Sequence, residues 1–273
     1  MTLINLFSPK GGVGCTTLCA NLGVVLQQLG YRVVLVDLDP QNALHLHFHF
    51  PATDERGLVD RFDSVSDWQD LLMDPAEGLE LLPFGSASDA QRDRFMAMQH
   101  FPGELSRRLR ALAQEPNTLI LVDANVTPLR KASPLIDEAD LNLLVLMADA
   151  GCVAMLPRLE AQEGSLRRAG GEGRLGYLIN QIDTRSRLKH EIAELMLARL
   201  SPLLVGSVHR DEAIAEALAE QRSLFEQAPF SAAAKDIGEA ARALAQRFPL
   251  RFSGLPPTGS RRAGSIPNAS GQP

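Results

Sequence analysis

A glycine-rich segment near the start of the chain has the residue types of a phosphate-binding loop. It comprises, in order, Pro9, Lys10, Gly11, Gly12, Val13, Gly14, Cys15, Thr16 and Thr17. Glycines let the backbone turn so that several N–H groups face one point, and a following helix N-terminus adds partial positive charge there. Thr16 is placed to offer a hydroxyl to Mg²⁺, and Thr17 to reach the α-phosphate of a nucleotide. The sequence therefore predicts nucleotide binding, against the alternative of a tight turn without a ligand.

Polar side chains also follow other apolar runs, at positions where the strands of a sheet would end. They are Asp37 and Asp39 after 33–36, Asp123 after 119–122, and Asn180 after 175–179. Ligands of open α/β sheets bind beyond the carboxyl ends of the strands, so these residues are candidate partners of the loop. Each also has a plainer interpretation, since Asp-Pro pairs and Asn are common in turns. Arg210 follows a later apolar run, and Asp211 beside it is interpreted as a helix N-cap.

The loop resembles the deviant Walker A motif of the MinD/ParA ATPases, through the pattern Lys-Gly-Gly-x-Gly-x-Thr-Thr over residues 10–17. The resemblance implies that Lys10 reaches across a nucleotide-sandwich dimer to the phosphates held by the partner. A second lysine of that family, which contacts the β- and γ-phosphates in its own subunit, is replaced here by Cys15. Losing that charge should weaken nucleotide binding and slow phosphoryl transfer. A helix N-terminus tends to lower a thiol pKa, which leaves a redox-reactive Cys15 open, but we favour a neutral residue that fills the loop.

The same resemblance implies roles for the acidic strand ends. Asp37 and Asp123 would join Thr16 in the shell of a Mg²⁺ ion, and Asp39 would orient the attacking water. Lys10 and Asp39 are thus the implied catalytic residues, and ATP and Mg²⁺ the implied cofactors. Many family members follow the second of these acids with Thr-Pro-Pro, whereas residues 124–126 here are Ala-Asn-Val, so the second switch is expected to differ.

For the base of the nucleotide, the resemblance implies that Asn180 hydrogen-bonds adenine. The segment 208–212 would approach the other side of the base, with Arg210 as its candidate contact.

Three further stretches, 67–72, 79–85 and 209–216, resemble BcsQ, the MinD-like accessory proteins of bacterial cellulose synthase operons. That resemblance extends over most of residues 1–250. It implies an ATP-bound homodimer, a small partner protein named BcsR, and a role in assembly or activity of the inner-membrane cellulose secretion complex. With Cys15 in the loop, at most slow ATP hydrolysis is expected.

Two other functions remain open at this stage. One is a ParA- or MinD-type positioning or partition ATPase that acts on the nucleoid or a membrane. The other is a degenerate scaffold that has lost the nucleotide altogether.

Short apolar runs alternate with helical patterns along the chain. Expected strands span 3–7, 33–36, 79–82, 119–122, 143–147, 175–179 and 203–205, and expected helices 16–29, 155–168, 188–200, 211–221 and 232–248. Strands that are apolar on both sides and alternate with helices indicate a parallel sheet covered on both faces. The predicted fold is therefore a doubly wound, mostly parallel α/β sheet of the P-loop NTPase type. The last helix is interpreted as a core helix rather than a membrane-binding one.

Residues 1–250 are expected to form this one nucleotide-binding domain. Residues 251–273 are rich in Gly, Pro and Ser and are expected to be a disordered tail. The weakly patterned stretch 51–68 is expected to be helix plus loop. His45, His47 and His49 alternate, so a strand would place them on one face; a Zn²⁺ site is open, but a partly exposed surface is favoured.

Composition limits the remaining function classes. The 33 acidic against 27 basic residues give a net charge of −6, which argues against coating nucleic acid. Basic clusters at 107–110, 167–168 and 185–189 are interpreted as solvated helix faces. Three cysteines favour a reducing compartment, and neither a signal peptide nor a membrane-spanning run is recognised. We expect a cytoplasmic protein that is peripheral to the inner membrane through its partners.

Overall fold

The fold is an eight-stranded sheet in the order β3-β4-β2-β5-β1-β6-β7-β8. The computed structural model describes residues 1–64, 67–99, 101, 103–115, 117–124, 134–163 and 174–247. The strands are β1 (Thr2–Phe7), β2 (Arg32–Asp37), β3 (Met73–Ala76), β4 (Leu79–Leu82), β5 (Thr118–Asp123), β6 (Leu141–Met147), β7 (Arg174–Ile182) and β8 (Leu204–His209). All neighbours pair in parallel except β3, which lies antiparallel to β4 at one edge. The predicted mostly parallel sheet is confirmed; the short strand β3 was not predicted.

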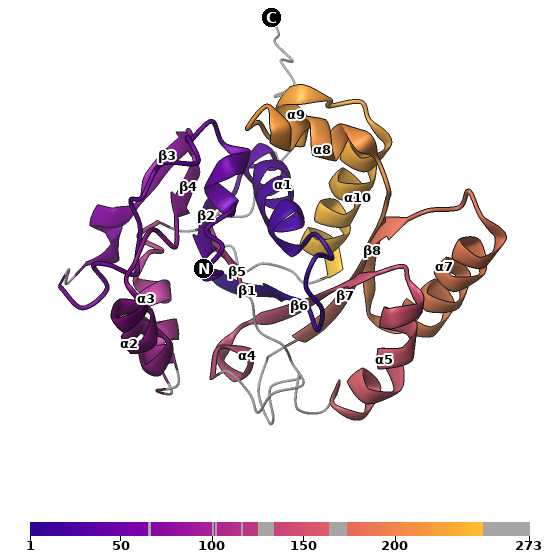
Figure 1. Ribbon diagram of the computed structural model, residues 1–273, viewed down its shortest axis with the longest axis horizontal. Helices are drawn as coiled ribbons and strands as arrows, with labels where there is room; N and C mark the ends of the chain where they lie inside the picture. The colour runs from indigo at the N-terminus through magenta and orange to yellow at the C-terminus, as the bar shows by residue number, and fades with distance from the viewer. Residues whose placement is uncertain are drawn as a thin grey trace, which may run out of the picture.

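Helices cover both faces of this sheet (Figure 1). They are α1 (Cys15–Gln28), α2 (Asp89–Gln99), α3 (Glu104–Ala111), α4 (Pro134–Glu138), α5 (Ala150–Ala161), α7 (Arg187–Leu200), α8 (Glu212–Ala219), α9 (Leu224–Gln227) and α10 (Ala232–Arg247), with short 3₁₀ helices η1 (Leu44–His47), η2 (Trp68–Leu71) and η3 (Ser201–Leu203). On one face α1, α8, α9 and α10 share a core with the sheet. The other face packs against α2, α3 and α4 at one end and against α5 and α7 at the other. The doubly wound architecture follows from strands that are buried on both sides.

The glycine loop is held between the two central elements of the fold. It leaves the buried strand β1 and enters α1 at Gly14, whose φ of 90° is left-handed. Such a conformation is strained for residues with a Cβ, which explains glycine at this position. The loop therefore sits at the carboxyl edge of the sheet, where the predicted polar strand ends also lie.

The stretch 51–68 differs from the predicted helix plus loop, because residues 51–64 form turns and a short 3₁₀ helix begins only at Trp68 within the described residues. The chain instead runs beside the end of β4, where Leu58 N donates to Pro83 O at 2.9 Å and Val59 N to Phe84 O at 3.0 Å. Gly57 and Gly85 cross there in backbone contact. A partner this distant in sequence leaves no periodic pattern, so the sequence alone did not reveal it.

We expect Gly57→Ala to destabilise the fold, because its new Cβ would lie under 3.0 Å from the backbone of Gly85. Backbone on both sides leaves little room to relax, so a loss of at least about 2 kcal/mol is expected. Urea unfolding measures it. Gly238→Ala is the control, since its Cβ would meet only the end of the Arg242 side chain at 3.4 Å. Equal stability of the two variants would contradict the close backbone contact between Gly57 and Gly85.

The histidine alternation does not form a strand. His45 and His47 lie in the 3₁₀ helix η1 and are buried, whereas His49 is exposed and pairs with Glu226 at 2.9 Å. The predicted partly exposed surface is therefore wrong for the first two, because η1 packs them into the protein beside α1. Burial lowers the pKa of His47 to about 4. Among the described residues no group of His, Cys, Asp and Glu is suited to hold a metal ion.

The basic clusters of the described residues are paired with acids. Arg107 and Arg108 contact Glu104, and Arg110 contacts Asp140. In the cluster at 185–189, Arg185 and Lys189 share Asp183 and Arg187 pairs with Glu191. These pairs make the clusters poor candidates for free, strongly basic surfaces. The cluster at 167–168 lies outside the described residues.

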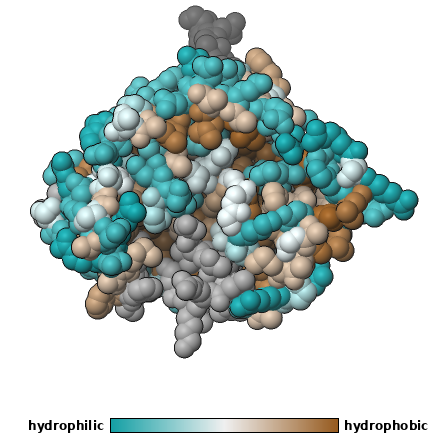
Figure 2. Space-filling model, in the orientation of Figure 1, coloured by the Kyte–Doolittle hydropathy of each residue, from teal (hydrophilic) through white to brown (hydrophobic). Residues whose placement is uncertain are grey.

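The last helix is a core element, as predicted, because Ile237 and Leu244 of α10 are buried against α1. Phe248 and the predicted tail, 251–273, lie outside the described residues. Hydrophilic residues cover most of the face in Figure 2, and hydrophobic ones show below α8 and α9 and beside α7. Leu188 and Leu195 of α7 are exposed. Within the described part of the chain, no helix is both long and apolar enough to cross a bilayer.

Candidate functional site: a phosphate cleft with an adjoining base pocket

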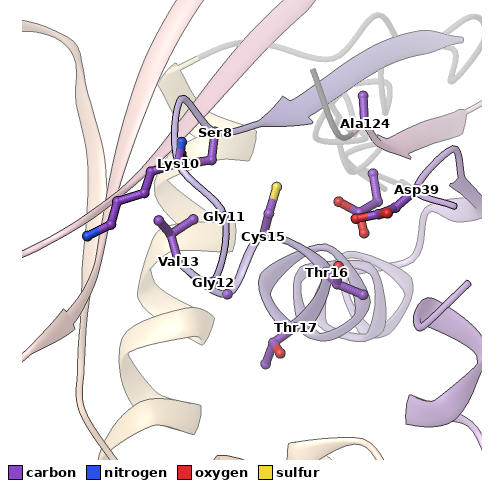
Figure 3. A pocket seen from close by; sticks show the side chains of 12 residues that line it. Ser8, Lys10, Gly11, Gly12, Val13, Cys15, Thr16, Thr17, Asp39 and Ala124 are labelled. Carbon is purple, nitrogen blue, oxygen red and sulfur yellow. Dashed lines mark hydrogen bonds between the residues drawn. The ribbon is translucent and has the colours of Figure 1, made fainter. Parts of the chain in front are cut away.

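The glycine loop lines a cleft of about 280 Å³ together with polar strand ends (Figure 3). Its lining comprises Ser8, Lys10, Gly11, Gly12, Val13, Gly14, Cys15, Thr16, Thr17, Asp39, Asp123 and Ala124. The structure thus brings together the loop, β5 and the segment after β2, as the sequence predicted. Of the residues 124–126, where the second switch is expected to differ, Ala124 lines the cleft, and Asn125 and Val126 lie outside the described residues.

The loop is braced from the end of β7. Asn180 Nδ2 donates to Val13 O at 2.7 Å, and Gln181 Nε2 donates to Gly12 O at 3.4 Å. A Cβ on Gly14 would lie 2.5 Å from the Asn180 amide nitrogen. Asn180 therefore fixes the loop in shape, a structural role that the sequence did not reveal.

Lys10 extends to the opposite side of the loop from Asp39 and Thr16 (Figure 3) and pairs with Asp149. Asp149 is the N-cap of α5 and also accepts from Cys152 N at 2.7 Å. The hydrogen bond with Asp149 raises the pKa of Lys10. Partial burial opposes ionisation of Asp149, but the Lys10 ammonium and the Cys152 amide outweigh it and lower its pKa. Lys10 is thus a cation paired with Asp149 at the edge of the cleft.

Sequence reasoning missed Asp149, although a signal was present. Asp37 and Asp123 are the last residues of apolar strands, and Asp149 lies just after the apolar strand β6. The sheet order places β6 directly beside β1, which carries the loop. That neighbour relation, unknown from sequence, makes Asp149 the partner of Lys10.

Cys15 points its sulfur into the space between the loop and the carboxylates (Figure 3). Burial, followed by the nearby Asp123 carboxylate, raises the pKa of this thiol well above its ordinary value. The lowered pKa that a helix N-terminus alone would give is therefore wrong here, because desolvation and negative charge outweigh the helix dipole. Cys15 is a neutral thiol where the resembled family has an ammonium.

The acids divide into one structural and two cleft-lining residues. Asp37 is fully buried, and its two oxygens accept from Leu44 N at 3.0 Å and Asp39 N at 2.9 Å. Burial and the nearby Asp123 raise the pKa of Asp37. It thereby shapes the segment after β2, whereas Asp39 and Asp123 face the cleft.

Asp123 has the features of a metal-shell carboxylate. Its Oδ2 is buried with no hydrogen-bond partner among the described residues, and the neighbouring Thr16 hydroxyl favours its charged form. Burial raises the pKa of Asp123, Thr16 and Cys15 partly offset that rise, and the resulting pKa is about 6. A hydroxyl beside an unsatisfied buried carboxylate oxygen fits a hydrated Mg²⁺, which prefers oxygen ligands. The residues present therefore fit Mg²⁺ bound with a triphosphate on the loop.

A second hollow of about 340 Å³ adjoins the first through Gly14 and Thr17. Its lining includes the polar residues Asn180, Gln181 and Arg210, together with Ile214, Ala215 and Leu218 of α8. Asp211 is the N-cap of α8, as predicted, and accepts from Ala213 N at 3.0 Å. A largely apolar lining with a few polar groups suits a planar base.

Comparison with known proteins gives a consistent result. The family model "Cellulose biosynthesis protein BcsQ" matches residues 1–247. The chain is 31% identical to BcsQ of Escherichia coli K12 over 95% of its length and 99% of that protein, and 30% identical to BcsQ of Salmonella typhimurium over 87% and 91%. In fold it is similar to MinD of Pyrococcus horikoshii, solved with Mg-ADP, at a TM-score of 0.70 and 22% identity, covering 90% of this chain and 96% of that one.

Proposed function

Since this chain belongs to the BcsQ family of cellulose biosynthesis proteins, we propose that it binds ATP with Mg²⁺ in the loop cleft. The observation that carries the proposal is the convergence of the glycine loop, Thr16, Asp39 and Asp123 on one cleft. The similar MinD of Pyrococcus horikoshii forms a complex with Mg-ADP, which supports the same ligand chemistry. A nucleotide-free scaffold would have no need of the unsatisfied oxygen of Asp123 in that cleft.

Each residue of the cleft has a distinct part in this proposal. The backbone amides of the loop bind the phosphates. Thr16 and Asp123 hold the metal ion, and the buried Asp37 supports this metal site by shaping the segment after β2. Asp39 orients the water for attack, and Asn180 and Arg210 contact the base. Mg²⁺ supplies charge neutralisation for the phosphates. Because Cys15 is neutral, hydrolysis is slow and bound ATP acts mainly as an assembly ligand.

Lys10 supplies the link to dimerisation. In one subunit it pairs with Asp149 and points away from Asp39 and Thr16. In the proposed dimer it leaves Asp149 and reaches the phosphates held by the partner subunit. Exchange of one anionic partner for another costs little, so the triphosphate can drive the change.

The test is the mass of the full chain in solution with ATP–Mg²⁺, with ADP–Mg²⁺ and without nucleotide. We expect a dimer only with ATP–Mg²⁺, and loss of at least about tenfold in dimer affinity for Lys10→Ala, since a charge-assisted contact is removed. Asp149→Asn is the matched control, because Asn retains an N-cap oxygen but not the charge that holds Lys10. It should dimerise at equal or lower ATP concentration. A monomer under all conditions would contradict the proposal.

For the biological role, we propose that this ATP-bound dimer supports assembly or activity of the cellulose synthesis and secretion complex at the inner membrane. Family membership supports the assignment to cellulose biosynthesis. The small protein BcsR is the proposed direct partner. In cells, Lys10→Ala at normal protein level should reduce cellulose output. Unchanged output would show that this role does not depend on the ATP-bound dimer.

A further inference from the structure

A histidine at the rim of the base pocket is held by a carboxylate from a distant helix. His209 ends β8 and lines the pocket. Asp236 of α10 lies 2.8 Å from the His209 ring nitrogen Nδ1, and the same oxygen accepts from His209 N at 2.9 Å. Asp236 is largely buried, whereas half of the His209 side chain is exposed. Two bonds to one anchored oxygen fix both the backbone and the ring of His209.

This contact also decides the chemistry of the exposed ring edge. A carboxylate can only accept, so Nδ1 of His209 carries the proton in the neutral ring. In the neutral ring the other nitrogen, Nε2, is then a hydrogen-bond acceptor. The loop that carries His209 is further tied to α10 through Asp211, whose second oxygen accepts from Ala233 N at 3.1 Å. The acceptor is therefore held on a rigid support.

Asn180 presents a second acceptor to the same pocket. Its Nδ2 is committed to Val13 O, which can only accept, so the orientation of the amide is fixed. The remaining Oδ1 is buried and has no partner among the described residues. Both Asn180 and His209 line the pocket, so each can accept a hydrogen bond from a donor placed in it.

We propose that His209, fixed by Asp236, is a second base-reading residue, which together with Asn180 selects a purine that carries a 6-amino group. This inference rests on the proposed nucleotide binding. The exocyclic amine of adenine offers two N–H donors, one for each acceptor. A 6-oxo purine presents a carbonyl oxygen there, which would face two acceptors and leave both unsatisfied. Asp236 acts through His209 and is a positioning residue.

The test compares the affinities of the full chain for Mg²⁺ complexes of ATP, ITP and tripolyphosphate by calorimetric titration. ITP differs from ATP in carrying an oxygen at position 6, and tripolyphosphate lacks a base. Wild type should prefer ATP over ITP by at least about tenfold. In His209→Phe and Asp236→Ala this preference should fall at least about threefold, while tripolyphosphate binding stays unchanged. Asp236→Asn keeps an acceptor oxygen for Nδ1 and should restore the preference.

The contradicting outcomes are distinct. An unchanged ATP-to-ITP ratio in His209→Phe and Asp236→Ala would overturn the base-reading role while leaving the proposed nucleotide site intact. An equal loss of affinity for all three ligands would show that His209 and Asp236 only support the fold, and would also overturn the base-reading role. Failure of wild type to bind any of the three would overturn the nucleotide site itself, and this inference with it.

Discussion

Cys15→Lys is expected to accelerate ATP hydrolysis at least about tenfold, which corresponds to a barrier lowered by about 1.4 kcal/mol. The sulfur of Cys15 points into the phosphate cleft, and burial next to Asp123 keeps the thiol neutral. An ammonium at this place would lie where negative charge builds up on the phosphates during transfer. Steady-state phosphate release under saturating ATP–Mg²⁺ is the measurement.

Two controls separate charge from size in this experiment. Cys15→Met lengthens the side chain without charge and should leave the rate near that of wild type. Cys15→Lys combined with Asp39→Asn should lose the gain, because the water would no longer be oriented. If Cys15→Lys hydrolyses ATP no faster than wild type, the missing lysine is not what limits the rate.

Asp123→Asn is expected to raise the thermal stability of the nucleotide-free protein at pH 7 and to abolish its further stabilisation by Mg²⁺–ATP. Burial raises the pKa of Asp123 to about 6 from 3.8, so ionising it at neutral pH costs the fold roughly 2 to 3 kcal/mol. Asparagine removes that cost but also the anionic oxygen proposed to face the metal ion. Unfolding midpoints with and without Mg²⁺–ATP measure both effects.

The pH dependence follows from the direction of this shift. Since the folded pKa lies above the unfolded value, the folded state binds the extra proton between about pH 4 and pH 6. The contribution of Asp123 is therefore most favourable at low pH and is lost as pH rises through 6. Asp37, whose pKa is also raised, acts in the same direction. Asp123→Asn should flatten the dependence of the unfolding free energy on pH between about pH 4 and pH 6. An unchanged dependence would refute the raised pKa of Asp123.

Asp39→Asn is the matched control for the Asp123 experiment, because Asp39 lines the same cleft but is only half-buried. It should change the midpoint of the nucleotide-free protein little and retain stabilisation by Mg²⁺–ATP. If both substitutions abolish that stabilisation, the metal shell extends to Asp39.

Much of the site was predictable because its parts are local in sequence. Glycines at 11, 12 and 14 between an apolar run and a helical pattern predict a loop at a strand end. Asp37 and Asp123 close apolar strands, and parallel strands bring their ends to one edge. The structure confirms the mostly parallel sheet, whereas the order of its strands was not predicted.

The remaining features depend on contacts between distant segments. Asp149 meets Lys10 only because β6 neighbours β1, and Asp236 meets His209 only because α10 packs along β8. The electrostatic state of Cys15 likewise depends on Asp123, a residue on another strand. Helix-terminus chemistry alone gave the wrong direction for that thiol, since burial dominates.

The histidine alternation shows a different limit. A period of two indicates a strand only when the segment pairs with neighbouring strands, and His45 and His47 instead enter a 3₁₀ helix beside α1. Burial by packing, rather than alternation, decides their environment.

A crystal structure of the full chain with Mg²⁺ and a non-hydrolysable ATP analogue is the decisive experiment for the nucleotide-bound dimer. We expect a triphosphate on the amides of residues 11–17, the metal ion between Thr16 and Asp123, and Lys10 of each subunit on the phosphates of the other. A loop that remains empty at saturating ligand, with Lys10 still paired to Asp149, would contradict this mechanism.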